Sequence, residues 1–478
     1  MDTKKKAIDG GKWITISTII STAFQFLQVS ILARLLEPAA FGIVSVCMLI
    51  INFFFIFSNL GFSNSIIYKQ ESDRKVLSTL YFLGLMLGIS MYFIIYFSSP
   101  LIVEFYKEPK LAKVVKLAAF YFPIIYCGQI YLFILQKELR FRSVALIEIM
   151  GAVSGTIVAI TLAYSGYEET SLIYGQLAMQ SVRTLLSIGL GFRLFIPMFY
   201  FNVTTIREHL RFAVFNVGDS LLGYIQGNCD NILVGSLLGL KSLGYYTIAY
   251  QLAVFPINKL NPIILQVAYP ILAKMKENSD ELKKSYIKIL DLISFLNFPL
   301  LAGLFITADS LIPLFYGPGW ENTIPLIHIF VLQSMCSCLA HPLFTIAYTK
   351  GKPNLLFYLN LVTLLVKLPL LYFFGKQWEV TGIALAFFTS TFVNLVLGFF
   401  IANHLIGAFI KEFLSNIYKP VLFCLFMVSA IMLYKSFLGY DGIVNTVAQI
   451  ALGGLVYLAL TFRYKLSFLE IQNLRRSL

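Results

Sequence analysis

The chain has 478 residues, of which 58% are apolar and only 13% are charged, and its mean hydropathy is +0.79. A soluble domain usually has about a quarter of its residues charged, so this composition excludes an ordinary soluble enzyme or binding domain. The net charge is +13, but the basic residues lie between apolar runs, which predicts membrane topology rather than nucleic-acid binding.

The apolar runs are long and continuous, and each approaches the roughly 20 residues that a helix needs to cross a bilayer. Continuous runs favour helices over the short alternating strands of a membrane barrel. We therefore predict an all-α integral membrane protein with about fourteen transmembrane helices. The predicted spans, in chain order, are Trp13–Ala33, Phe41–Ile67, Leu77–Phe97, Leu111–Gln136, Ala145–Gly166, Ser171–Phe192, Phe212–Leu238, Leu243–Leu272, Ile289–Ala308, Thr323–Tyr348, Leu355–Phe374, Thr381–Asn403, Tyr418–Tyr434 and Ile443–Phe462.

The distribution of basic residues predicts how these spans are oriented. With the N-terminus inside, 26 of the 37 Lys and Arg residues fall in cytoplasmic segments, 8 fall in outer segments and 3 lie within spans. A missed or extra span would move every later loop to the other side and destroy this bias. The positive-inside rule therefore predicts that both termini are cytoplasmic.

Two matched turns indicate an internal repeat. Leu35–Gly42 matches Leu237–Gly244 at an offset of 202 residues, and Leu101–Tyr106 matches Leu311–Tyr316 at an offset of 210. Each six-span half begins and ends on the same side of the membrane, so the two repeats are parallel. The predicted regions are a six-helix bundle over residues 1–205, a second over 206–410, and two further helices with a tail over 411–478.

Several motifs in both halves point to one known family. They are Gly11–Trp13, Leu32–Gly42, Asn228–Gly239, Leu243–Tyr250 and Val267–Leu272. With these motifs, the chain resembles the Wzx-like polysaccharide flippases of the multidrug/oligosaccharidyl-lipid/polysaccharide exporter superfamily. Within that branch it is most similar to the colanic-acid and teichuronic-acid exporter group.

This resemblance implies a MATE-like, V-shaped pair of helical bundles. It implies a transporter, not an enzyme, that flips an undecaprenyl-type lipid-linked oligosaccharide from the inner to the outer leaflet by alternating access. Such a substrate is an exopolysaccharide or O-antigen repeat unit. The implied location is the bacterial cytoplasmic (inner) membrane, with membrane lipids and the polymerase and glycosyltransferases of the same pathway as partners.

Ionisable side chains inside a span are costly, so each one is a candidate for transport. In the seventh span, Asp219 and Asp230 are 11 residues apart, which places them about 20° apart on one helical face. This polar face suits the wall of a wet cavity. It equally fits two structural carboxylates that bond to backbone or to a Lys of a neighbouring helix.

The eighth span is interrupted by two prolines. Pro256 and Pro262 flank Asn258, Lys259 and Asn261, which predicts a broken helix around a cation. Broken helices are where transporters bend and bind. Two roles for Lys259 stay open: contact with a diphosphate or acidic sugar, or neutralisation of a carboxylate of the seventh span.

The first span carries an uncharged polar stripe of Thr18, Ser21, Gln25 and Gln28. Such a stripe suits sugar hydroxyls, and it equally suits the packing of neighbouring helices. Arg34, at the outer end of this span, either guards the exit of a substrate or anchors the helix at the interface.

Two further cations lie inside spans, Arg183 in the sixth and Lys367 in the eleventh. A cationic lumen fits a pyrophosphate-linked substrate, because transfer of that anion across lipid without help is prohibitive. Together with Lys259 they outnumber the acidic candidates, which favours an anionic substrate. Glu148 and Asp291 lie near cytoplasmic helix ends and are interpreted as structural.

The sequence has no Walker motif, HExxH, Gly-x-Ser-x-Gly or paired His/Cys metal spacing. We therefore predict no cofactor, no metal and no ATP-driven transport by this chain alone. Coupling to H⁺ or Na⁺ through a carboxylate of the seventh span is an open alternative. The competing functions are a multidrug or peptidoglycan-precursor exporter on the same scaffold, and a membrane glycan polymerase or ligase, which would need a sizeable outer loop.

Overall fold

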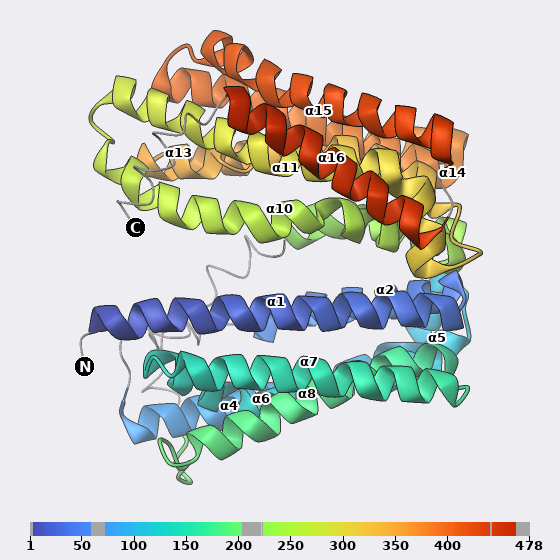
Figure 1. Ribbon diagram of the computed structural model, residues 1–478. Coiled ribbons are helices and arrows are strands. Elements are labelled where there is room, and N and C mark those ends of the chain that lie inside the picture. Colours follow the sequence, from blue (N-terminus) through green and yellow to red (C-terminus); the bar gives the residue numbers. More distant parts are fainter. Residues whose placement is uncertain (1–2, 59–71, 203–220, 222, 440–441, 465–478) are drawn as a thin grey trace. The chain divides into compact units, whose positions relative to one another are not determined.

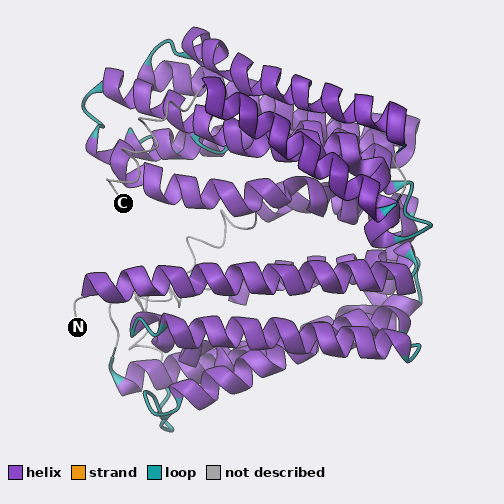
Figure 2. Ribbon diagram, in the orientation of Figure 1, coloured by secondary structure: helices purple, strands orange, loops and turns teal. Residues whose placement is uncertain are grey.

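A computed structural model describes residues 3–58, 72–202, 221, 223–439 and 442–464. Every regular element in these residues is helical (Figure 2). The elements are α1 (Thr3–Leu35), α2 (Pro38–Ser58), α4 (Arg74–Tyr106), α5 (Lys110–Ala118), α6 (Tyr121–Lys137), α7 (Phe141–Tyr164), α8 (Glu168–Gly191), the π-helical η2 (Val234–Leu238), α10 (Leu240–Lys274), α11 (Ser279–Tyr316), α12 (Thr323–Ala340), α13 (Leu343–Thr349), α14 (Asn354–Ile406), α15 (Ile410–Leu438) and α16 (Ile443–Tyr464).

Ten helical stretches of the described chain are long and apolar enough to cross a membrane. One of them, α14, holds two predicted spans, because the backbone leaves helical geometry at Trp378 and Glu379. The other three predicted spans correspond to α8, α10 and the segment ending in η2, which are not among the ten, and the seventh span begins outside the described residues. The predicted all-α membrane fold is confirmed.

The chain divides into two compact units, Met1–Gly244 and Tyr245–Leu478. The boundary that the repeat predicts, between residues 205 and 206, lies outside the described residues, so this division stays a prediction.

The first unit is a bundle in which α7 packs against both α1 and α8 (Figure 1). A β-carbon on Gly155 of α7 would lie 2.9 Å from the Gly175 carbonyl oxygen of α8, and one on Gly175 would lie equally close to the Gly155 oxygen. Small residues at such a crossing let two membrane helices approach closely. This contact fixes the register between α7 and α8, which form one wall of the site described below.

The second unit is built around α11, which packs against α12, α15 and α16. The hydroxyl of Tyr457 on α16 donates to the Phe295 carbonyl oxygen of α11 at 3.1 Å. Phe409, Phe423 and Met427 from α15 and the turn before it are buried in the same core cluster. The two helices that the sequence places outside the repeat therefore belong to the core of the second unit.

The matched turns of the predicted repeat occupy comparable places. The motif Leu101–Tyr106 ends α4, and its counterpart Leu311–Tyr316 ends α11. Within the first unit, the N-terminal turns of α2 and α10 meet backbone to backbone. A β-carbon on Gly42 would collide with the Leu240 carbonyl oxygen, and one on Gly244 would collide with the Pro38 carbonyl oxygen. The predicted offset of 202 residues relates Gly42 to Gly244 and Pro38 to Leu240. The glycine of each turn therefore packs against the other turn at matching positions.

Candidate functional site

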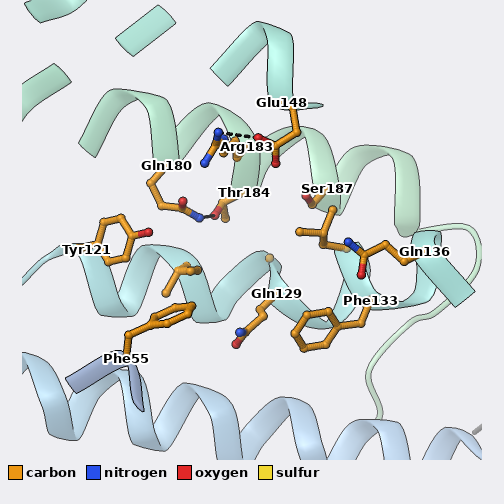
Figure 3. A pocket seen from close by; sticks show the side chains of 13 residues that line it. Phe55, Tyr121, Gln129, Phe133, Gln136, Glu148, Gln180, Arg183, Thr184 and Ser187 are labelled. Atoms are coloured by element: carbon orange, nitrogen blue, oxygen red, sulfur yellow. Dashed lines mark hydrogen bonds and ion pairs between the residues drawn. The ribbon is translucent and has the colours of Figure 1, made fainter. Parts of the chain in front are cut away.

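A polar pocket of about 400 Å³ lies inside the first unit. Residues of α6 line it from Tyr121 to Gln136, and α8 supplies most of the facing wall (Figure 3). Phe55 of α2 and Glu148 of α7 complete the lining. The volume falls within the roughly 300–1,000 Å³ that is typical of small-molecule sites.

An ion pair stands on the wall of this pocket. The Arg183 guanidinium donates from Nη2 to Oε2 of Glu148 at 2.5 Å, and their side chains are 23% and 35% exposed. Figure 3 shows the two side chains meeting across the α7–α8 crossing. The carboxylate lowers the cost of holding a guanidinium among membrane helices. Because both groups stay partly open to the pocket, a ligand can reach them.

The position of Arg183 depends on a glycine of the neighbouring helix. A β-carbon on Gly151 of α7 would lie 2.6 Å from Cγ and 3.0 Å from Nε of Arg183. The side-chain stem therefore occupies the notch that the glycine leaves. Its Nε is buried and has no hydrogen-bond partner among the described residues. A guanidinium has five N–H donors, so any donor for a ligand must come from the terminal nitrogens, beyond the one bonded to Glu148.

Amide and hydroxyl groups surround the charged pair. Gln180 donates to Thr184 Oγ1 at 3.4 Å, and that hydroxyl donates to the Ile124 carbonyl oxygen at 2.8 Å. Gln129, Gln136 and Ser187 also line the pocket. A cluster of amides, hydroxyls and one guanidinium can donate to the oxygen atoms of a sugar or a phosphate.

Of the residues predicted as substrate contacts, Arg183 lies on this pocket. Glu148, interpreted from the sequence as structural, lies on it too. The sequence does contain a signal for Glu148: Gly151 and Gly155 form a Gly-x-x-x-Gly motif that predicts close helix packing. Glu148 is one turn before this motif on the same helical face, so its contact with the next polar helix could have been expected.

The polar stripe of α1 divides between two environments. Gln28 Oε1 accepts a hydrogen bond from the Thr156 hydroxyl of α7 at 3.2 Å, which is a helix-packing contact. Ser21 is buried, whereas Gln25 is exposed. Arg34 is exposed at the end of α1. Neither Gln25 nor Arg34 lines the pocket of the first unit.

The predicted break in the eighth span is wrong. α10 runs as one helix from Leu240 to Lys274 with Pro256 and Pro262 inside it, because a proline can kink a long helix without ending it. Asn258 and Lys259 are exposed, and the Lys259 ammonium lies 5.9 Å from the Phe255 ring centre.

Asn261 of α10 is a buried structural contact in the second unit. Its Nδ2 donates to the Cys338 carbonyl oxygen at 3.2 Å, and its Oδ1 accepts from Asn297 at 3.0 Å. Since Asn261 is fully buried, these bonds satisfy its amide without a ligand. They join α10 to α11 and α12.

Lys367 is 1% exposed in the second unit, and its ammonium lies 3.9 Å from the Phe387 ring centre. The two residues belong to the two arms of α14, on either side of the break at Trp378. A second bond, from Asn394 Nδ2 to Thr363 Oγ1 at 2.9 Å, also joins the arms. The cation therefore helps to hold this helical hairpin together.

Of the two acidic candidates, only Asp230 lies in the part of the chain that the structure describes. Asp230 is 1% exposed within the helical residues 223–233. Asp219 lies outside the described residues, and its place at a cavity wall stays a prediction. The described residues contain no group of three or more His, Cys, Asp or Glu side chains that could hold a metal ion.

Comparison with known proteins assigns the chain to a family. Residues 31–325 match the family described as "polysaccharide biosynthesis protein". Among similar proteins, the lipopolysaccharide biosynthesis protein WzxC of Escherichia coli K12 is 28% identical over 421 residues, which is 88% of this chain and 86% of WzxC. The teichuronic acid biosynthesis protein TuaB of Bacillus subtilis is 27% identical over 87% of this chain and 86% of TuaB.

Solved structures support the same fold. The lipid II flippase MurJ in an inward closed conformation has a TM-score of 0.75 at 17% identity, covering 94% of this chain and 98% of MurJ. An inward-facing MATE-family multidrug transporter has a TM-score of 0.63 at 14% identity, covering 84% of this chain and 99% of the transporter. The predicted resemblance to Wzx-like flippases is confirmed. The chain is a multi-pass membrane protein that belongs to the polysaccharide biosynthesis protein family.

Proposed function

We propose that this protein is a flippase that moves a lipid-linked oligosaccharide from the inner to the outer leaflet by alternating access. Membership of the polysaccharide biosynthesis family and the names of the relatives support this proposal. The fold that it shares with MurJ and a MATE transporter supports a transport mechanism rather than catalysis.

The observation that carries the proposal is the polar pocket around Arg183. A guanidinium, a carboxylate and several amides lie inside a bundle of membrane helices, where each polar group is costly. Such a pocket gives the headgroup of the substrate a route that lipid does not offer, because its hydrogen-bonding groups replace the water that the headgroup leaves. The apolar tail needs no such route and stays in the bilayer.

The substrate, location and partners follow from the same proposal. We infer an undecaprenyl-type carrier with an exopolysaccharide or O-antigen repeat unit, transported in a bacterial cytoplasmic membrane with both termini inside. The polymerase and glycosyltransferases of the pathway are the proposed partners. Coupling to H⁺ or Na⁺ is proposed to involve Asp219 or Asp230, the carboxylates of the seventh span.

A flipping assay in vesicles tests the proposal. The purified full chain is reconstituted with a polyprenyl-diphosphate disaccharide that carries a nitrobenzoxadiazole label on its sugar, and dithionite added outside bleaches the outer label. In vesicles that contain the protein, we expect the labelled glycolipid of the inner leaflet to reach the outer leaflet over time, where dithionite bleaches it. Equal rates in protein-free vesicles would contradict the proposal. Parallel vesicles with labelled lipid II, or with a cationic dye in place of the glycolipid, distinguish the alternative exporters.

A further inference from the structure

A short non-helical segment follows α8 and lies against the start of α4. We call residues 192–202 the strap. It contains Pro197, which has no backbone donor for a helix and restricts the residue before it to extended geometry. Beyond its first turn the strap is irregular, and it forms the loop beyond the end of α8 (Figure 2).

Side chains from the first two turns of α4 hold the strap in place. Arg74 Nε donates to the Ile196 carbonyl oxygen at 2.7 Å. The backbone N–H groups of Met198 and Asn202 donate to the hydroxyls of Ser78 at 3.0 Å and Thr79 at 3.4 Å. These bonds satisfy part of the strap's backbone, so it has a defined inner and outer side.

The inner side of the strap is packed and its outer side is apolar. Phe195 is 4% exposed and packs against the rings of Tyr81 and Tyr131. Four large apolar side chains point outward with exposures of 48%, 49%, 102% and 48%: Phe192, Ile196, Phe199 and Phe201. A row of large apolar side chains exposed to water would be unfavourable.

The strap belongs to the basic end of the first unit. The described residues at this end (9–13, 72–75, 137–142 and 192–202) contain seven basic and three acidic side chains. The opposite end (34–37, 104–116, 165–169 and 239–244) contains six basic and five acidic side chains. The strap itself contributes exposed Arg193 and no acidic residue, and the Lys75 ammonium lies 5.5 Å from the Tyr200 ring centre.

We propose that the strap is a docking surface for anionic phospholipids of the cytoplasmic leaflet. Its irregular backbone excludes it from the hydrocarbon, where backbone N–H and C=O groups without hydrogen-bond partners are not tolerated. Its aromatic side chains favour the boundary between headgroups and acyl chains, where Trp, Tyr and Phe side chains gather. The excess of basic side chains matches the negative surface of that leaflet.

The second unit has no comparable segment at the matching place. Only Gly407, Ala408 and Phe409 lie between α14 and α15, and Phe409 is fully buried. The lipid contact is therefore a property of the first unit and not of the repeat. Anchoring the strap fixes the end of this unit where α4 begins and α8 ends in the leaflet.

Spin labelling of the full chain in vesicles tests this proposal. The six cysteines lie in helices and none forms a disulfide bond. They are replaced by serine or alanine so that the nitroxide reacts only at the introduced cysteine. A nitroxide is then attached at Phe199→Cys, and at Glu138→Cys as an exposed control from the same end. Collision rates with oxygen, which enriches in lipid, and with a water-soluble nickel chelate report the depth of each label. Vesicles contain phosphatidylcholine alone or with one third phosphatidylglycerol.

The expected result is that the label at 199 collides mainly with oxygen, at a depth of about 5–10 Å, while the label at 138 collides with the nickel chelate. Phosphatidylglycerol should deepen the label at 199, and Arg193→Gln should reduce this shift. If the label at 199 collides with the nickel chelate as often as the label at 138 does, the proposal is wrong. It is also wrong if the depth of the label at 199 is the same with and without phosphatidylglycerol. The assay does not depend on transport, so its outcome is independent of the proposed flippase activity.

Discussion

Each unit holds a basic side chain inside its helical bundle, and the two are stabilised in different ways. Arg183 pairs with Glu148 on the wall of a pocket, and its side chain remains 23% exposed. Lys367 is 1% exposed, and its ammonium lies against the Phe387 ring at 3.9 Å. The first cation borders open space, whereas the second is enclosed by protein.

This difference separates a cation that can meet a ligand from one that stabilises the fold. Both residues are equally conspicuous in the sequence, because each is a charge inside an apolar run. A guanidinium that is partly exposed at the edge of a pocket can bind an incoming oxyanion. A sealed ammonium that joins the two arms of α14 acts on stability instead.

The largest stability effect is expected from Lys367→Met. The substitution keeps the length of the side chain but removes the contact with Phe387, which is worth about 2 kcal/mol when desolvated. Thermal unfolding in detergent should show a lower Tm. Lys376→Met, which removes an exposed cation from the same helix, should leave Tm nearly unchanged. Equal shifts in the two variants would contradict a structural role for Lys367.

Gly151→Ala should displace Arg183 from its notch. Overpacking costs about 1–3 kcal/mol, partly offset because Ala favours a helix over Gly by about 1 kcal/mol. We expect a modest loss of stability together with slower flipping. Gly189→Ala on α8 is the matched control, since no atom lies within 4 Å of the added carbon. A normal flipping rate in Gly151→Ala would show that the notch is not needed.

Thr184→Val should give the smallest effect. It keeps the shape of the side chain but removes the hydroxyl that bonds to the Ile124 oxygen and accepts from Gln180. The loss of such bonds costs about 0.5–1.5 kcal/mol. Thr161→Val, whose hydroxyl bonds the exposed backbone of its own helix, provides the comparison in the same unfolding assay. A larger loss in the control would contradict the account of the pocket wall.

Much of the fold could be predicted from hydropathy alone, because a span must be both long and apolar. The two motifs Leu101–Tyr106 and Leu311–Tyr316 were expected in turns after the third and ninth spans, but they form the last residues of α4 and α11. The break in the eighth span could not be judged from the prolines, since Pro256 and Pro262 remain inside one helix when tertiary packing supports it.

The site was only partly predictable. Arg183 stands out because it is a charge within a span. Its partner depends on the register of α7 against α8, which the contact of Gly155 with Gly175 sets in three dimensions. Gln28 and Asn261 show the reverse case: polar residues that suit a substrate in one dimension are used by neighbouring helices in the structure. Sequence spacing identifies a polar face but not what covers it.

The measurement that tests the central claim most directly compares Arg183→Gln with Glu148→Gln in the vesicle flipping assay. Each variant removes one member of the same ion pair, so a purely structural pair predicts similar losses for both. If the guanidinium is the contact for the substrate, Arg183→Gln should slow flipping at least about tenfold, which corresponds to about 1.4 kcal/mol. Glu148→Gln, which leaves the cation in place, should stay within about threefold of the wild-type rate. Equal rates in the two variants would contradict the assignment of Arg183 to the substrate.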